Sequence, residues 1–465
     1  MKNNILMIVV DQLAWKALSV YGNKDSKTPN IDSLSASGVT ADSCYCSYPL
    51  CQPSRASLWS GQHPHRNRVW SNGRAWPIEK IDATYPALGA TFRDAGYETR
   101  HYGKCHDGGA LRGFVCSEEK ETHIEDERKE FPFNMDTYAD KYTLDCAVDY
   151  ISSYDKSKPL FAVVDFINPH NICGWIGVNK GEHENTLDLS VLPELPDNFD
   201  FDDISSRPLP VQYLCCSHVR QSQTSLWTRD NFREYLAAYY YYLNVVDRYI
   251  GEVLKALKSN GMDENTLIVF TSDHGDNMTS RRSVTKQVTM YEEVTRVPLI
   301  FSGAGVKHLD KPVKGLCSLL DIFPTLCSYA GIDIPKGVDG IDIRQIMDKG
   351  TLPEREFITS EWFTEWGYTI SPGRMIRKGD VKYIKYLEGN GEELYLLDKD
   401  PGEKHNVKDF EPEILSQMRA LLDKHIQDTD DPFYSLEVKA DKRWRSHKLG
   451  YDNHRGIAAP EYKED

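Results

Sequence analysis

Short apolar runs alternate with longer helical patterns along the first 330 residues of the chain. Runs of five to seven mostly β-branched and aromatic residues, bounded by polar ones, are typical of strands that are buried on both faces. This alternation predicts an α/β fold, in which helices sandwich a large, mostly parallel mixed sheet. The predicted strands are Ile5–Val10, Glu98–Tyr102, Leu160–Phe166, Leu267–Thr271 and Val297–Phe301.

The clearest helical pattern follows Asp230 and ends before Gly261. Its apolar residues recur at spacings of three and four, which is the period of one helix face packed on a core. Between residues 181 and 230 the sequence is rich in Pro, Asp and Ser and shows no periodicity, so it predicts a long insertion across the surface.

The pattern changes near Glu356. Alternating apolar and polar residues at 375–377, 382–386 and 393–397 predict antiparallel strands. A helix is predicted over 411–426 after them. We therefore expect two domains, a catalytic α/β domain over 1–355 and a smaller C-terminal α+β subdomain with an antiparallel sheet over 356–465.

The composition is that of a globular protein, because 40% of the 465 residues are apolar and 11% aromatic. The net charge of −15 argues against nonspecific nucleic-acid binding, which needs a basic surface. No apolar run approaches the roughly 18 residues of a membrane span. As written, the chain begins without a signal peptide and is expected in the cytoplasm, or in the periplasm or outside the cell if a leader has been removed.

The eleven cysteines form no regular spacing pattern. An odd number that includes the adjacent Cys215 and Cys216 is typical of thiols in a reducing compartment rather than of a disulfide framework.

Two predicted strands end in an acidic residue followed by a neutral donor. Asp11 and Gln12 follow the first strand, and Asp273 and His274 follow the strand 267–271. Ligands of open α/β sheets bind at the carboxyl ends of strands, and hard divalent cations prefer oxygen ligands. These four residues are therefore candidate metal ligands, although a single Asp at a strand end more often only begins a loop or caps a helix.

Cys51 precedes a predicted short helix that carries Arg55 in its first turns. A helix start offers unpaired N–H groups and a positive dipole end, both favourable for a tetrahedral oxyanion. A lone buried Cys is more often a small hydrophobic residue. A zinc site of Cys44, Cys46 and Cys51 is a weaker alternative, because no Cys-x-x-Cys partner follows.

The segment Cys51-x-Pro-Ser-Arg-Ala-Ser-Leu-x-Ser-Gly61 resembles the signature of formylglycine-dependent sulfatases, which belong to the alkaline phosphatase superfamily. Among them, the chain most resembles bacterial carbohydrate and choline sulfatases. The resemblance implies an alkaline phosphatase-like fold and a maturation enzyme that oxidises Cys51 to formylglycine. Further segments match the family in order: Ile8–Gln12, Thr28–Asp32, Tyr102–His106, Asn168–His170, Thr271–Asp276, Tyr291–Ile300 and Leu394–Asn406.

The resemblance implies roles for individual residues. Hydrated formylglycine at position 51 attacks sulfur and later expels sulfate, a collapse that a plain serine cannot undergo. Arg55 and Lys104 hold the modified residue, and His106 contacts it as a base. His170 and Lys286 bind the sulfate and assist the leaving oxygen.

The resemblance also implies one divalent cation bound by Asp11, Gln12, the modified Cys51, Asp273 and His274. Gln12 and His274 replace residues that are more often Asp and Asn in the family. This combination resembles sulfatases to which calcium is assigned, with magnesium as the alternative. Lys286 lies five positions before Tyr291, where many sulfatases place the lysine four before the aromatic residue.

The expected activity is hydrolysis of a sulfate monoester, with an O-sulfated carbohydrate derived from a glycosaminoglycan or another sulfated sugar as substrate. Two alternatives are a phosphonate monoester or phosphodiester hydrolase of the same superfamily, and a noncatalytic sulfated-glycan binder in which Cys51 stays a thiol. Because the chain is acidic, we expect a short saccharide bound by its end in a pocket, not a polyanion in a groove. The expected substrate-binding residues are Lys104, His170, Lys286, Arg74 and Trp175.

Overall fold

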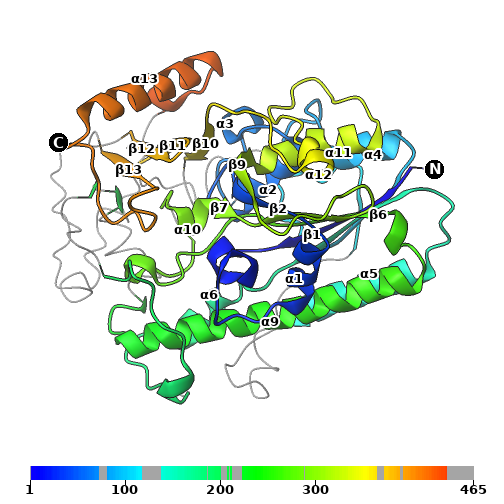
Figure 1. Cartoon of the computed structure of the whole chain (residues 1–465), viewed down its shortest axis with the longest axis horizontal. Coiled ribbons are helices and arrows are strands. Elements are labelled where there is room, and N and C mark those ends of the chain that lie inside the picture. Colours follow the sequence, from blue (N-terminus) through cyan, green and yellow to red (C-terminus); the bar gives the residue numbers. More distant parts are fainter. Residues whose placement is uncertain are drawn as a thin grey trace.

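The structure is a computed structural model of the whole chain (Figure 1). It describes residues 2–72, 81–117, 138–185, 187–200, 207–208, 210–211, 223–286, 289–363, 371–387 and 391–436.

A nine-stranded sheet forms the centre of the protein (Figure 1). Five neighbouring strands, from β4 to β6 in spatial order, run parallel, whereas β8 pairs antiparallel with both β6 and β2. The predicted mostly parallel mixed sheet is therefore confirmed. In spatial order the strands are β4 (Val115–Cys116), β3 (Glu98–Gly103), β5 (Leu160–Phe166), β1 (Asn4–Val10), β6 (Thr266–Ser272), β8 (Leu299–Gly303), β2 (Gly38–Tyr45) and β7 (Arg296–Val297), and β9 (Val313–Ser318) pairs with β2.

Helices cover both faces of this sheet (Figure 1). Successive side chains of β1 enter two separate cores, which explains why its whole sequence is apolar: Leu6 and Ile8 face one core, and Ile5 and Met7 face the other. Helices α1 (Pro29–Ala36), α5 (Tyr138–Ser153), α6 (Ile172–Val178) and α9 (Arg229–Ser259) pack on the first core, and α2 (Cys51–Ser60), α4 (Leu88–Asp94), α11 (Ile322–Ala330) and α12 (Gln345–Lys349) on the second.

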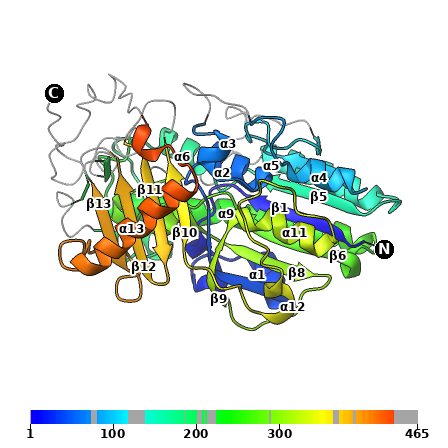
Figure 2. The same cartoon turned by 90° about the horizontal axis from the view of Figure 1, so that it is seen from above.

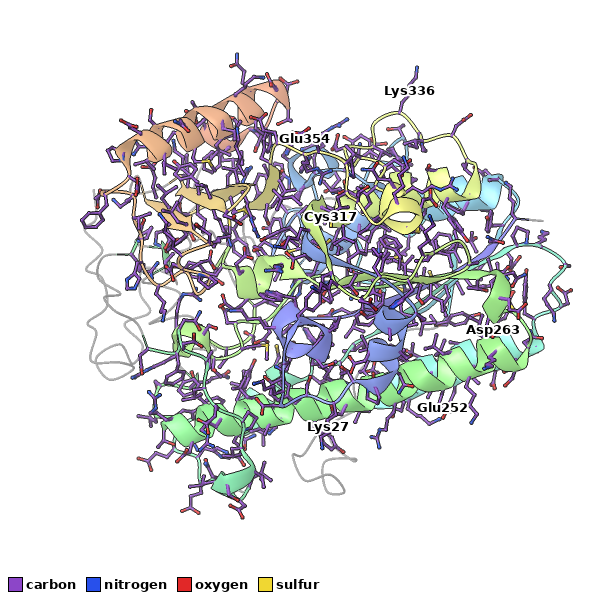
Figure 3. All side chains as sticks on the ribbon, in the orientation of Figure 1. Lys27, Glu252, Asp263, Cys317, Lys336 and Glu354 are labelled. Carbon is purple, nitrogen blue, oxygen red and sulfur yellow. The ribbon has the colours of Figure 1, made fainter. Side chains whose placement is uncertain are left out.

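The longest of the described helices, α9, confirms the helix predicted after Asp230. The Thr228 side chain accepts a hydrogen bond from the Asn231 backbone N–H, and the Asn231 side chain accepts one in return from the Thr228 backbone N–H. This reciprocal capping satisfies two N–H groups that would otherwise lack partners at the helix start. The apolar face of α9 packs on the sheet, and Glu252 on its other side points away from the body of the protein (Figure 3).

A second, four-stranded antiparallel sheet lies beside the first (Figure 2). One of its faces packs on α13 (Pro412–Asp428), and the other contacts the large α/β part through residues such as Tyr45 and Tyr291. The predicted antiparallel subdomain is confirmed, while its boundary at 355/356 stays a prediction. The strands are β10 (Ile358–Trp362), β11 (Gly373–Lys378), β12 (Val381–Tyr386) and β13 (Glu392–Leu396).

The structure departs from the predicted elements at two places. The predicted strand Val297–Phe301 is divided into β7 and β8 at Pro298, because proline has no N–H for a sheet ladder. Strand β2 was not predicted, because its sequence Gly-Val-Thr-Ala-Asp-Ser-Cys-Tyr is small and polar rather than apolar. It is nevertheless almost entirely buried, since strands flank it on both sides.

Three further expectations concern the cysteines, the predicted insertion and membrane-spanning helices. Nine of the eleven cysteines lie in the described residues, where each has a thiol, and Cys215 and Cys216 lie outside them. Much of the predicted insertion, including 212–222, also lies outside. Among the described helices, none is both long enough and apolar enough to span a bilayer.

Candidate active site

Four parallel strands bring their carboxyl ends to one edge of the large sheet. In the register of β1 with its two neighbours, Val10 pairs with Phe166 and with Ser272, so the next residues, Asp11 and Asp273, meet at this edge. On β3, Gly103 (φ +94°) pairs with Asp165. A Cβ at Gly103 would lie 2.0 Å from the Asp165 carbonyl oxygen, so only glycine lets Lys104 enter the site here.

Cys51 is the first residue of α2, whose N-terminus faces this strand edge. Leu50 is the N-cap residue in an extended conformation, and Gly61 ends the helix with φ +67°. The Ser54 hydroxyl donates a 2.6 Å hydrogen bond to the Asp273 carbonyl oxygen, which ties the first turn of α2 to the end of β6. The Cys51 side chain is thereby held beside the predicted metal ligands.

Basic and imidazole groups converge on the Cys51 Sγ atom. Lys286 Nζ lies 3.0 Å and His274 Nε2 3.2 Å from Sγ. His106 and His170 also lie within hydrogen-bonding reach of the thiol. The structure thus brings three of the predicted catalytic side chains, those of Lys286, His106 and His170, around one atom, while their individual roles stay predictions.

Arg55 binds three carboxylates and is fully buried. Its Nε donates to Asp273 Oδ2 at 2.8 Å, Nη1 to Asp165 Oδ2 at 2.5 Å and Nη2 to Asp11 Oδ2 at 3.1 Å. Lys104 Nζ donates to the same Asp11 oxygen. Because a buried guanidinium can hold several carboxylates in fixed directions, Arg55 organises the floor of the site.

The electrostatic field at Cys51 favours an anion. Burial alone would raise the pKa of the Cys51 thiol, but the positive charges of Lys104, Lys286 and His274 outweigh it and hold this pKa well below its ordinary value. Burial, together with Lys286 and Lys104, lowers the pKa of His170 to about 4. His170 is therefore neutral near pH 7, and its ring can accept or donate a hydrogen bond.

Asp11, Cys51, Asp273 and His274 also fit a metal ion. One ligand atom from each lies within 4.8 Å of the others, and all four residues are buried. Burial raises the pKa of Asp273 to about 6 and Asp11 adds to the effect, as expected for two carboxylates that share one site. Two carboxylates with one imidazole form a donor set that suits a hard divalent cation.

Gln12 reaches this cluster through hydrogen bonds. Its Oε1 accepts from Lys286 Nζ at 2.8 Å, its Nε2 donates to Asp276 Oδ2 at 2.7 Å, and its backbone N–H donates to Asp273 Oδ1 at 3.0 Å. These contacts make Gln12 a bridge that positions Lys286 and Asp273. Its predicted role as a metal ligand stays a prediction.

Two further predicted substrate-binding residues are Arg74 and Trp175. Arg74 lies outside the described residues. Trp175 is only 3% exposed and packs edge-on against Trp227 and Tyr235 in the core under α9, and its substrate-binding role stays a prediction. Trp175 is buried because α6 turns its apolar face towards this core.

Two site residues were not predicted. Asp165 binds Arg55, and Asp276 accepts hydrogen bonds from both Gln12 and the Tyr235 hydroxyl. Asp165 did carry a signal, because it is the one charged residue in the apolar run 160–166. Such a residue is stable in a buried strand only with a charged partner.

The chain matches two protein-family models and is similar to a curated sulfatase. A family model described as Sulfatase matches residues 3–332, and one described as N-sulphoglucosamine sulphohydrolase, C-terminal, matches residues 284–430. The chain is 44% identical over 466 residues to a Delta 4,5-hexuronate-2-O-sulfatase of Bacteroides thetaiotaomicron, covering 99% of this chain and 96% of that protein.

Solved structures of related proteins superpose on this fold. The structure of a 2-O GAG sulfatase superposes with a TM-score of 0.91 at 43% identity and covers 99% of each chain. The phosphonate monoester hydrolase of Agrobacterium radiobacter has a TM-score of 0.74 at 22% identity, with 92% of this chain and 96% of that chain covered, so it shares the fold.

Proposed function

The chain belongs to the sulfatase family and is a sulfuric ester hydrolase, and on this premise we propose that it removes an O-sulfate from a carbohydrate through a formylglycine made from Cys51. One observation carries the proposal. The Cys51 Sγ atom stands at the start of α2, 3.0 Å from Lys286 Nζ and 3.2 Å from His274 Nε2. A cation-lined position at a helix start suits a sulfate group bound next to the attacking residue.

A formylglycine at position 51, when hydrated, supplies one hydroxyl that attacks sulfur and a second whose deprotonation later expels sulfate. His106 is within reach of residue 51 and accepts that proton. Arg55 keeps Asp11 and Asp273 in place, so both carboxylates face residue 51. The side chains of the chain itself thus fix the position of the nucleophile and of the base.

Lys104, Lys286 and His170 contact the sulfate in this proposal. Lys104 and Lys286 both lie close enough to Cys51 to lower the pKa of its thiol. Each is only 7% exposed, so water screens its charge little. His170 donates a hydrogen bond to the leaving oxygen, which departs poorly as an alkoxide. Asp11, Asp273, His274 and residue 51 would hold a divalent cation, which would polarise the sulfate and residue 51. We propose calcium, with magnesium as the alternative.

The substrate we propose is a 2-O-sulfated, 4,5-unsaturated hexuronate at the end of a saccharide. The support is the 44% identity, across nearly the whole chain, to the relative that acts on this group. A 4,5-unsaturated hexuronate has lost its C4 oxygen and so occurs only at a chain end. A chain end also suits a protein with a net charge of −15, because such a protein repels an extended polyanion.

The test is sulfate release from matched disaccharides by the chain coproduced with a maturation enzyme. We expect fast release from the unsaturated 2-O-sulfated disaccharide and much slower release from the 6-O-sulfated isomer. A phosphate or phosphonate ester turned over faster than every sulfate ester would instead indicate the phosphonate hydrolase alternative. Mass spectrometry of the Cys51 peptide checks the modification, and an unmodified thiol in fully active protein would refute the formylglycine.

A further inference from the structure

A second group of metal-ligating side chains lies beside the active site but outside it. His101 on β3 and Cys116 on β4 are partners in the register of these two parallel strands, so their side chains leave the sheet on the same face. Cys105 lies two residues beyond the end of β3. One ligand atom from each of the three residues lies within 4.8 Å of the other two.

His101 is the buried member of this group, with no exposed surface. Neither of its ring nitrogens completes a hydrogen bond of good geometry to another described residue. Its Nε2 stands 3.5 Å from Asp165 Oδ2, and the ring also lies within reach of Cys105. A buried imidazole without a full hydrogen bond is costly, which points to a ligand that the protein side chains do not supply.

We propose that His101, Cys105 and Cys116 bind one zinc ion. Two thiolates and one imidazole form a borderline-soft donor set that suits Zn²⁺ and is unsuited to Ca²⁺, so this site differs in kind from the carboxylate-rich site at Asp11. Binding releases the two thiol protons to solvent and involves no oxidation. Cys116 is exposed, so a water molecule can occupy the fourth coordination position.

The contacts around the three residues support this assignment. Metal-bound histidines usually donate their second ring N–H to a carboxylate, and Asp165 is placed to accept from His101. A disulfide between Cys105 and Cys116 would use only the two sulfur atoms and would leave the buried ring of His101 without a ligand. The zinc assignment therefore accounts for all three residues.

The site has a consequence for catalysis. Cys105 lies between Lys104 and His106, and Asp165 also holds Arg55. A zinc ion on Cys105 and His101 would therefore anchor the segment that carries two of the proposed catalytic side chains. This role does not depend on the identity of the sulfated substrate.

The experiment uses the reduced full-length chain with Cys51→Ala, which removes the thiol of the active site, in excess Ca²⁺ to fill the carboxylate site. Co²⁺ serves as a spectroscopic probe for Zn²⁺, because cobalt bound to thiolates gives a sulfur-to-metal charge-transfer band. We expect one equivalent of Co²⁺ to produce this band, Zn²⁺ to displace it, and Zn²⁺ to raise the melting temperature.

The added substitution Cys116→Ser should abolish the band and the thermal shift, and the exposed position of Cys116 keeps the risk of misfolding low. The matched control is Cys146→Ser, a partly buried cysteine on α5 outside the group, which should keep both. Absence of the band in the reduced Cys51→Ala chain, or a band of equal strength after Cys116→Ser, would overturn the zinc site.

Discussion

Two of the buried clusters of charged side chains in the described residues differ in how their charges are paired. The catalytic cluster comprises Arg55 with Asp11, Asp165 and Asp273 at the edge of the large sheet, next to Cys51. The inter-sheet cluster comprises Glu292 and Glu403 with Arg377 and Lys382, where the two sheets meet. Both contain acidic side chains with strongly shifted pKa values, so burial and pKa alone do not distinguish them.

The partners of the charges do distinguish the clusters. In the inter-sheet cluster, Lys382 Nζ lies 3.1 Å from Glu292 Oε1 and 2.9 Å from Glu403 Oε1, so one ammonium joins two segments of the chain. Burial would raise the pKa of Glu292, but Lys382 and Arg377 outweigh it and lower this pKa to about 2. Each charge there neutralises another charge of the protein.

Beside the catalytic cluster, by contrast, Lys286 points at Cys51 and not at a carboxylate of the metal group. Lys104 and His274 add positive potential at the same atom. This excess of positive charge at one small side chain is suited to an anionic substrate. Convergence of cations on one reactive atom, and not burial of charge, therefore marks the functional cluster.

The largest expected effect is the loss of activity on replacing Cys51. Cys51→Ala should lower sulfate release by at least about 10⁴-fold, the scale on which loss of a catalytic nucleophile acts. The fold should persist, because only one sulfur atom is removed and little cavity forms. Sulfate release and thermal unfolding measure the two effects. The matched control Cys327→Ala, in the core at α11, should keep its activity.

Cys51→Ser tests whether turnover needs the second hydroxyl of a hydrated formylglycine at this position. A serine could accept the sulfo group but has no second hydroxyl to expel sulfate, so at most one turnover per chain is expected. Rapid-quench counting of released alcohol against enzyme concentration measures this. Sustained turnover by the serine variant would exclude the diol from the mechanism.

Removal of the proposed cation should have the next largest effect. A bound cation stabilises the charge of the transition state by several kcal/mol. Chelation should therefore lower activity by about 10²- to 10³-fold. Added Ca²⁺ should restore it, and Asp273→Asn should make the loss permanent. Glu292→Gln, which removes a carboxylate from the inter-sheet cluster, should still respond to Ca²⁺ like the wild type. Full activity after exhaustive chelation would refute the metal site.

Substitutions in the inter-sheet cluster should act on stability instead. Lys382→Met leaves Glu292 and Glu403 buried without their shared cation, so the free energy of unfolding should fall by about 3–5 kcal/mol. Urea unfolding measures this change. The control Lys378→Met removes an exposed partner of Glu356 and should cost less than about 1 kcal/mol. A large loss of kcat in folded Lys382→Met protein would mean that the clusters are not separate.

The smallest expected effect is a pH dependence of stability. The folded-state pKa of Glu292 lies near 2, below its ordinary value of 4.5. Its ionic contribution is therefore present above about pH 4.5 and is lost as the pH falls towards 2. The difference in unfolding free energy between wild type and Glu292→Gln should shrink over that range in urea titrations. A difference that stays constant with pH would contradict the pairing of Glu292.

The sequence predicted those elements whose burial produces a regular pattern of apolar residues. β1 and β5 are buried on both faces and so read as continuous apolar runs, and α9 shows one clear apolar face. β2 lacks such a pattern, because neighbouring strands rather than its own apolar side chains determine its burial. Pro298 was visible in the sequence and divides the strand, but the pairing of β8 with β6 as well as with β2, the partner of β7, follows from the order of the strands in the sheet.

By itself, the sequence determined the enzyme class of this protein, because the sulfatase signature at Cys51 is a local pattern. Only the tertiary structure decided which side chains share the site. The register of β1 with β5 brings Asp165 to Arg55, and the inward turn of α6 packs Trp175 against Trp227. Contacts between residues more than 100 positions apart depend on strand order and packing, which no local pattern of residues encodes.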